Sequence, residues 1–242
     1  IGTPSMKPLI IFGTGKIADV AYQHFLRDSE YQVVAFTCDA AWLPSLAGSE
    51  PTHHDLPLLA FEEIERHFPP AAFALFVAVG YQELNALRVR KCAQARAKGY
   101  RLASYVSPRA DQGPWLDLGD NCLILDGVGI QPGVRLGNNV FVWNNTLIGH
   151  HSVVHDDCWL AAGATLGGCA VVGERCFVGL NATIGGELTI GADSFLGAAV
   201  LILKNAPPRS VFIAGATEKF RLESDAFLRM SRMPALARAA KG

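Results

Sequence analysis

The feature that most constrains this chain is a six-residue repeat that begins at Leu118 and runs without a break to Ile202. Every sixth position in this stretch is Val, Ile or Leu, which gives fifteen matches in fifteen positions (118 to 202 in steps of six). A period of six fits neither an amphipathic α-helix nor an alternating strand. Short parallel strands joined by turns, three to a coil of 18 residues, have this period, and they bury a continuous core only when the coils stack. The repeat therefore predicts a left-handed parallel β-helix of hexapeptide repeats.

Two other positions of the repeat have their own composition. Glycine follows the aliphatic residue in nine of the fifteen repeats, and we attribute it to a turn conformation that a β-carbon would oppose. Small or β-branched residues, Cys122, Cys158 and Cys176 among them, occupy the position four after the aliphatic residue. The six cysteines form no C-x-x-C pair, so we interpret all of them as reduced packing residues.

The chain before the repeat alternates between strand-like and helix-like segments. This alternation predicts a small Rossmann-like α/β domain with a parallel sheet, followed by the β-helix. We expect three parts: residues 1–106, the β-helix at 107–217, and a tail at 218–242 with a short helix near Glu223–Met230. The predicted strands are Pro8–Gly13, Tyr31–Cys38, Ala72–Val79 and Arg101–Val106, the predicted helices are Lys16–Arg27 and Glu83–Lys98, and a strand-loop and helix are expected over Leu58–His67.

A glycine-rich turn lies between the first predicted strand and helix. Gly13, Gly15 and Lys16 belong to the sequence Gly-Thr-Gly-Lys-Ile-Ala, a G-x-G-x-x-A pattern. Such a turn presents backbone amides and the positive end of a helix dipole to a phosphate. Asp39 follows the next strand, where an acidic residue can bind a ribose hydroxyl. The pattern favours nucleotide binding, but a domain of about 100 residues is too small for the two halves of a dinucleotide fold.

Composition excludes several classes of protein. With a net charge of -1, the chain has no excess of positive charge to bind the phosphates of nucleic acid. No apolar run reaches the roughly 18 residues that a membrane span needs, and the first residues lack the pattern of a signal peptide. We therefore expect a cytoplasmic protein that binds neither membrane nor nucleic acid.

Three of the seven histidines cluster between residues 150 and 155. His150 stands two positions after an inward aliphatic residue, where side chains point out of the β-helix, and Gly168 takes the same position one coil later. Acyl transfer needs a base for the attacking amine or hydroxyl and a donor for the thioester oxyanion. His150 and the Gly168 amide are candidates for these roles. His151 is either a second functional group or a subunit contact, and Asp156 and Asp157 are solvated turn residues or partners of an imidazole.

Two alternatives exist for His150: an exposed turn histidine without a function, and a metal ligand. His150 and His155 are spaced like a ligand pair of the γ-class carbonic anhydrases, which are also left-handed β-helices. Those enzymes take a third histidine two coils earlier, and this chain has Pro114 there and no histidine between residues 68 and 149. A three-histidine zinc site is therefore not expected in the β-helix, and we predict no metal.

The whole pattern resembles one family. The glycine turn, a Ser-Pro junction at Ser107, the uninterrupted β-helix and the Ile-Gly-His motif at His150 resemble the bacterial nucleotide-4-amino-sugar N-acetyltransferases and their sialic-acid O-acetyltransferase relatives. These are hexapeptide-repeat sugar acyltransferases. Val79-Gly80 with Asn85 and Arg88 also matches the N-terminal domain of that family. Near the C-terminus, Gly-Ala-Thr-Glu-Lys, which ends at Lys219, loosely matches its Gly-x-Pro-Ala-Lys.

The resemblance implies a homotrimer that transfers an acetyl group from acetyl-CoA to the amine, at C4, of a nucleotide-linked amino sugar. It implies that His150 is the general base. It places the nucleotide near Gly13, Gly15 and Asp39, and it places acetyl-CoA in the cleft between neighbouring β-helices. The implied substrate-binding residues are Gly13, Gly15, Lys16, Asp39 and Gly80, and the implied cofactor-binding residues are Trp159, Gly168, Gly186 and Lys219.

Some positions depart from the family pattern. His151 stands where members carry an acidic residue after the base, and Lys16-Ile17 stands where they carry histidine in the glycine turn. Trp159 replaces a histidine that contacts the acyl end of the cofactor. Two alternatives to N-acetylation stay open: O-acetylation of a sugar hydroxyl, and a non-catalytic trimer that kept the fold and lost the chemistry.

Overall fold

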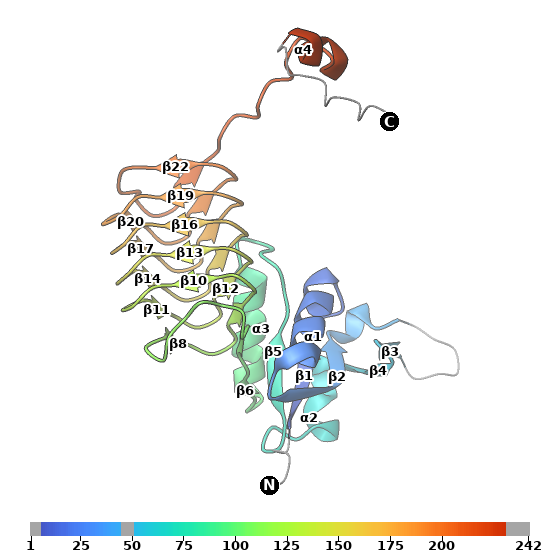
Figure 1. Cartoon of the computed structure of the whole chain (residues 1–242). Helices are drawn as coiled ribbons and strands as arrows, with labels where there is room; N and C mark the ends of the chain where they lie inside the picture. The colour runs from blue at the N-terminus through green and yellow to red at the C-terminus, as the bar shows by residue number, and fades with distance from the viewer. Residues whose placement is uncertain (1–5, 45–50, 231–242) are drawn as a thin grey trace, which may run out of the picture.

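The computed structural model describes residues 6–44 and 51–230, which form an α/β unit, a β-helix and a C-terminal extension (Figure 1). The α/β unit contains a six-stranded sheet in the order β3-β4-β2-β1-β5-β6, parallel except for the β3–β4 hairpin. Its elements are β1 (Lys7–Phe12), α1 (Lys16–Asp28), β2 (Tyr31–Cys38), η1 (Ala40–Trp42), β3 (Thr52–His53), β4 (Leu56–Ala60), η2 (Phe61–Glu63), α2 (Ile64–His67), β5 (Ala74–Val77), α3 (Ala86–Ala97) and β6 (Arg101–Leu102).

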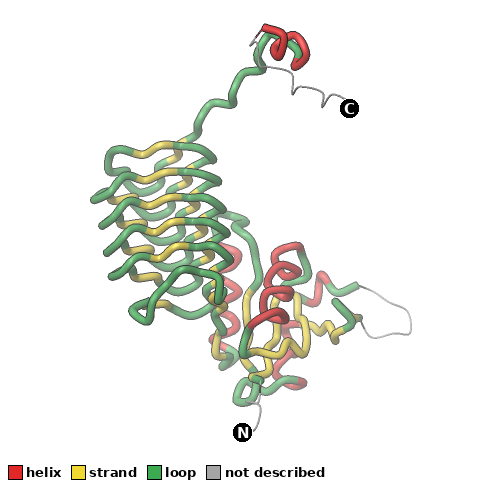
Figure 2. The backbone as a smooth tube through the Cα atoms, viewed as in Figure 1, coloured by secondary structure: helices red, strands yellow, loops and turns green. Residues whose placement is uncertain are grey.

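The β-helix has three sheets of two-residue parallel strands, as the hexapeptide period predicts (Figure 2). Paired residues in neighbouring coils are 18 apart; Val142, for example, pairs with Leu160. The first free sheet contains β10 (Gly129–Ile130), β13 (Leu147–Ile148), β16 (Thr165–Leu166), β19 (Thr183–Ile184) and β22 (Leu201–Ile202). The second free sheet contains β8 (Asp117–Leu118), β11 (Arg135–Leu136), β14 (Val153–Val154), β17 (Val171–Val172) and β20 (Thr189–Ile190).

The third sheet, here called the docked sheet, carries the α/β unit on its outer face. It contains β7 (Tyr105–Val106), β9 (Leu123–Ile124), β12 (Phe141–Val142), β15 (Trp159–Leu160), β18 (Phe177–Val178), β21 (Phe195–Leu196) and β23 (Val211–Phe212). The fourteen inward aliphatic residues from Ile124 to Ile202 are buried, and the first, Leu118, packs partly exposed against them. The predicted fold class is thereby confirmed.

The glycines after the aliphatic residues have a different role from the one we expected. The left-handed backbone conformation falls two positions later, at residues such as Asn145 (φ 59°) and His151 (φ 57°). A β-carbon at Gly149 would instead lie 2.5 Å from the backbone nitrogen of Gly168 in the next coil. Most of these glycines, though not Gly185, are therefore required by the close approach of stacked turns, and the turn-conformation explanation is wrong.

Aromatic side chains join the α/β unit to the docked sheet. Phe141, Trp159 and Phe177 point outward from successive coils and are almost fully buried under the α/β unit. Phe76 of β5 stacks on Phe141, with ring centroids 5.7 Å apart. Arg88 of α3 is completely buried at the same junction. The two units thus share one continuous packed interface.

The structure divides a predicted strand at the N-terminal end of the β-helix and confirms a predicted helix beyond its C-terminal end. The predicted strand Arg101–Val106 divides, because β6 completes the α/β sheet whereas β7 pairs with β9 and opens the docked sheet. The predicted short C-terminal helix is present as α4 (Ser224–Met230), which stands apart from the β-helix at the end of an extended segment (Figure 1). Over the described residues, none of the helices combines the length and apolar character required to traverse a bilayer.

Candidate active site

His150 lies on the corner of the β-helix between the two free sheets, in the turn from β13 to β14. Its backbone N–H donates to Oε1 of Gln131, one coil earlier, at 2.8 Å. Its ring is exposed, and its Nδ1 lies 3.2 Å from Nδ1 of His151, whose left-handed conformation sets the direction of the second ring. Gln131, which sequence reasoning missed, therefore anchors the segment that carries the imidazole.

The structure brings His150 and Gly168 together. A β-carbon at Gly168 would lie 2.5 Å from Nε2 of His150, so the imidazole covers this glycine directly. Among the residues that the structure describes, none accepts a hydrogen bond from the Gly168 N–H. Gly186 continues the same position into the following coil. The corner thus combines an exposed imidazole with a strip of backbone that carries no side chains, and one amide of that strip is available to an incoming oxygen.

Cys169 lies beside the imidazole. Its Sγ is 4.0 Å from Nδ1 of His150, and it is exposed, whereas Cys38, Cys92, Cys122, Cys158 and Cys176 are buried. The interpretation of all six cysteines as packing residues is therefore wrong for Cys169. The reason is its place: it stands three after an aliphatic residue, in a left-handed turn (φ 58°) on the corner between the two free sheets, which the α/β unit does not cover.

This difference in exposure predicts selective labelling. Brief treatment of the native protein with a maleimide should modify one thiol, because five of the six are covered by packed side chains. Intact-mass measurement after treatment should show a single adduct, and Cys169→Ser should show none. Two or more adducts on the folded protein, or an unchanged adduct in Cys169→Ser, would contradict this arrangement.

The glycine turn lines a cavity at the carboxyl end of the α/β sheet. Gly13, Gly15, Lys16 and Gly80 border a hollow of about 340 Å³. Gly13 has φ 123°, and a β-carbon there would lie 2.8 Å from the carbonyl oxygen of Ala78, so only glycine fits. The chain order of the sheet reverses between β1 and β5, which are the strands that end at this hollow. Ligands of open α/β sheets bind at such a switch point.

Asp39 lies outside that hollow. It follows β2, and its Oδ1 accepts a hydrogen bond at 2.6 Å from Nζ of Lys91 on α3. The Lys91 ammonium is nearly buried and also lies over the ring of Phe12, 5.3 Å from its centroid. Lys91 was not singled out in the sequence, because a lysine on an amphipathic helix ordinarily faces solvent.

Two of the predicted cofactor residues lie away from His150. Trp159 is only 4% exposed and packs on the docked sheet against Phe141 and Trp143, across the β-helix from the His150 corner. Within its own chain it therefore serves interdomain packing. Lys219 is exposed in the C-terminal extension, where it pairs with Glu223.

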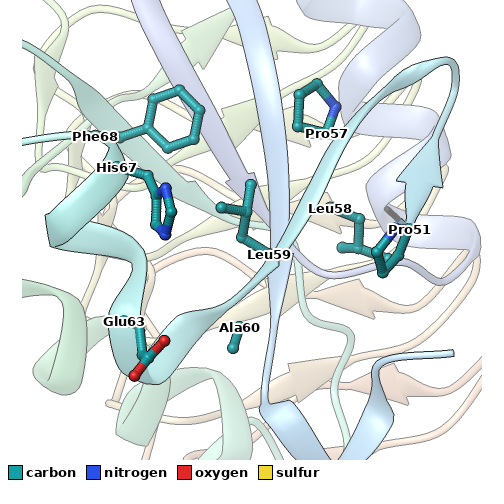
Figure 3. A pocket seen from close by; sticks show the side chains of 8 residues that line it. All are labelled: Pro51, Pro57, Leu58, Leu59, Ala60, Glu63, His67 and Phe68. Carbon is teal, nitrogen blue, oxygen red and sulfur yellow. The ribbon is translucent and has the colours of Figure 1, made fainter. Parts of the chain in front are cut away.

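A second hollow of the α/β unit contains none of the predicted site residues. It has a volume of about 460 Å³ and lies between β4 and the η2–α2 segment. Figure 3 shows Leu58, Leu59 and Phe68 around it, with Glu63 and His67 contributing polar groups. It is separate from the hollow at the glycine turn.

In one chain, the glycine-turn hollow and the His150 corner are on different sides of the β-helix. The α/β unit covers the docked sheet, whereas His150 lies where the two free sheets meet. The hollow at Gly13 and the His150 imidazole of the same chain are therefore on different sides of the β-helix.

Comparisons with known proteins agree with this geometry. The model of the bacterial transferase hexapeptide repeat (six repeats) matches residues 117–150 and 151–186. The structure is similar to that of perosamine N-acetyltransferase from Caulobacter crescentus in complex with CoA and GDP-perosamine. The two share 26% identity with a TM-score of 0.72, over 84% of this chain and 92% of that one. No curated protein sequence matches the chain.

A second similar structure is the acetyltransferase domain of PglB from Neisseria gonorrhoeae. It shares 22% identity with a TM-score of 0.71, over 83% of this chain and 93% of that one. The same domain has been solved in complex with acetyl coenzyme A. At this identity the likeness concerns the fold, in which an α/β unit precedes the β-helix. The resemblance to hexapeptide-repeat sugar acyltransferases that the sequence predicted is thereby confirmed.

Proposed function

We propose that this chain, which carries the hexapeptide repeat of bacterial transferases, is an acyl-CoA-dependent N-acetyltransferase that acts on the amine of a nucleotide-linked amino sugar. The observation that carries the proposal is the exposed His150 imidazole directly above Gly168, whose N–H is unengaged among the described residues. The similarity, over 84% of the chain, to an enzyme solved with CoA and a GDP-linked amino sugar supports it.

The chemistry assigned to the corner is a single acyl transfer. Nε2 of His150 accepts a proton from the sugar amine as its nitrogen attacks the thioester carbonyl. The carbonyl oxygen gains negative charge, and the Gly168 N–H donates to it. The carbon–sulfur bond then breaks. The leaving CoA sulfur takes the proton from His150, which returns to its neutral form. One thioester and one amine become one amide and one thiol.

We assign the nucleotide to the glycine-turn hollow. The amides at Gly15 and the dipole of α1 suit a phosphate, and Lys16 adds a positive charge beside it. Gly80 leaves room on the opposite wall. Asp39 lies outside the hollow, and we assign its carboxylate oxygen that Lys91 does not bind to a ribose hydroxyl of a nucleotide that extends beyond it.

We propose that a homotrimer completes the site, since the hollow and the His150 corner of one chain lie on different sides. Acetyl-CoA would lie in the cleft between neighbouring β-helices, along the side-chain-free strip of Gly168 and Gly186. We assign Lys219, whose exposed ammonium pairs with Glu223, to the phosphates of the cofactor. We assign Trp159 to packing within its own chain and no longer to the cofactor. The free thiols of all six cysteines fit a cytoplasmic enzyme.

The test is an assay of thiol release from acetyl-CoA with a panel of UDP-, dTDP- and GDP-linked 4-amino sugars. We expect release with one of the amines and a product whose mass is increased by one acetyl group. The matching 4-hydroxy sugars are the control, and acetylation of these instead would favour O-acetylation. If acetyl-CoA is not consumed and does not raise the melting temperature of the protein, the result favours a non-catalytic trimer.

Replacement of Gly168 by alanine should lower the activity without unfolding the protein. The β-carbon of Gly168→Ala would meet Nε2 of His150 at 2.5 Å, so the imidazole must swing away. A displacement of about 1 Å costs roughly 100-fold in rate, and we expect a loss of this size in kcat/KM. Gly129→Ala is the matched control, because its β-carbon meets only the flexible end of Leu147, at 3.2 Å. Equal activity of the two variants would contradict the assigned geometry.

A further inference from the structure

A cluster of two histidines and one aspartate joins the β3–β4 hairpin to α1. Nε2 of His53 and Nε2 of His54 both lie against Oδ1 of Asp19, at 3.0 Å and 2.9 Å. Asp19 is in the first turn of α1, and the histidines end β3 and begin the hairpin loop. The three ligand atoms all lie within 4.8 Å of one another. None of these residues has a role in the proposed acyl transfer.

The two imidazoles are held in place by packing. The His54 ring stacks on Tyr22, with centroids 4.6 Å apart, and the His53 ring meets the edge of Phe36, also at 4.6 Å. The side chains of His53 and His54 are 23% and 30% exposed. Both rings are therefore fixed before any ligand arrives, and one side of the cluster stays open to water.

The loop of the β3–β4 hairpin also contains residues that are uncommon in its backbone conformation. His54 and Asp55 form its two-residue loop with φ values of 49° and 60°, a conformation for which Asn-Gly and Asp-Gly are preferred. A histidine in the first of these positions adopts a left-handed conformation at an energetic cost. This conformation places its ring beside that of His53, with centroids 4.6 Å apart.

We propose that Asp19, His53 and His54 form a binding site for a divalent transition metal ion of the Zn²⁺ type. Zinc takes imidazole nitrogen and carboxylate oxygen at about 2.0–2.2 Å in a tetrahedral arrangement, so its ligand atoms are about 3.3 Å apart. The two nitrogen–oxygen separations, 3.0 Å and 2.9 Å, are slightly shorter than that spacing, and the two nitrogens lie within 4.8 Å of each other, so small side-chain shifts would bring the three atoms to a metal. Each imidazole would bind the metal as a neutral ring, through an unprotonated Nε2 and with its proton on Nδ1, and the ionised carboxylate of Asp19 would bind through Oδ1. Water from the open side supplies the fourth ligand.

The role of this site is stabilisation of the α/β unit. The metal would tie the edge hairpin of the sheet to α1, the helix that begins at the glycine turn. Anything that binds the folded state alone raises its stability by mass action. The inference is independent of the proposed acetyl transfer, because the cluster is on the α/β unit and His150 is on the β-helix corner.

The test is titration of the chelator-treated full chain with Zn²⁺, by calorimetry and thermal unfolding. The expected result is one site per chain and a higher melting temperature at saturating metal. His53→Ala and Asp19→Asn should each weaken binding by at least about 100-fold, since even partners of metal ligands contribute 10- to 100-fold. Circular dichroism and the melting temperature without metal show whether each variant is folded.

His150 has two other potential ligands nearby, with its Nδ1 3.2 Å from Nδ1 of His151 and 4.0 Å from Sγ of Cys169, so a second variant tests whether added metal binds there instead. The double variant His150→Ala/His151→Ala should keep the site, and its Co²⁺ complex should show tetrahedral absorption bands without thiolate charge transfer. Loss of binding in this double variant would overturn the proposal, as would unchanged affinity in folded His53→Ala. A stoichiometry of zero for the unmodified chain would also overturn it.

Discussion

Replacement of His150 by alanine is expected to lower kcat/KM for acetyl transfer by about 10²- to 10⁴-fold, the usual contribution of a positioned general base. The imidazole is the group above Gly168 that can accept a proton, and its removal leaves the amine to lose its proton to water. The fold should be unaffected, because the ring is exposed and the segment is held through its backbone by Gln131. The melting temperature should therefore stay near that of the unmodified protein.

His155→Ala is the matched control for this prediction, since His155 is an exposed histidine in the same stretch. We expect its kcat/KM to stay within about twofold of the unmodified value. The deficit of His150→Ala should also shrink as pH rises, because a larger share of the amine is then already deprotonated. A full rate in His150→Ala at neutral pH, or an equal loss in His155→Ala, would remove His150 from the mechanism.

The sequence predicts the β-helix and the site on its corner because both follow from a fixed period. Once three hexapeptides make a coil, residues 18 apart are stacked, and this places Gly168 under His150. The absence of a C-x-x-C pair does not determine exposure: Cys169 stands three after the aliphatic residue of its repeat and is exposed, whereas Cys122, Cys158 and Cys176 stand four after theirs and are buried.

Contacts between segments that are distant in the sequence have no such period, and sequence analysis missed them. Asp39 was predicted to be free for a ligand, but Lys91 on a distant helix binds one of its oxygens. Trp159 was predicted to be at the cofactor, but the α/β unit covers its face of the β-helix. The first outcome depends on how α3 packs within the α/β unit and the second on how that unit packs against the docked sheet, and local patterns encode neither.

Arg88 is the centre of that packing. Its guanidinium is fully buried and donates to side-chain or backbone oxygens of five residues: Asn139, Gly80, Asn85, Asp157 and Cys158. Its Cζ lies 4.4 Å from the centroid of the Phe141 ring. Complete burial lowers the pKa of Arg88 to about 10, which still leaves it charged at neutral pH. The cation thus binds α3 to two successive coils of the β-helix.

Arg88→Leu should therefore destabilise the protein by about 3–5 kcal/mol, because it leaves several buried oxygens without donors, each at a cost of about 1–3 kcal/mol. The measurement is urea unfolding followed by tryptophan fluorescence, which senses this junction since Trp159 lies 5.7 Å from Cζ of Arg88. Arg88→Lys should recover part of the loss at most, as an ammonium cannot reach all of these oxygens at once. Arg90→Ala, on the same helix, removes an exposed pair with Glu83 and should leave the unfolding midpoint nearly unchanged. If Arg88→Leu and Arg90→Ala unfold at the same urea concentration, the buried guanidinium does not hold the two units together.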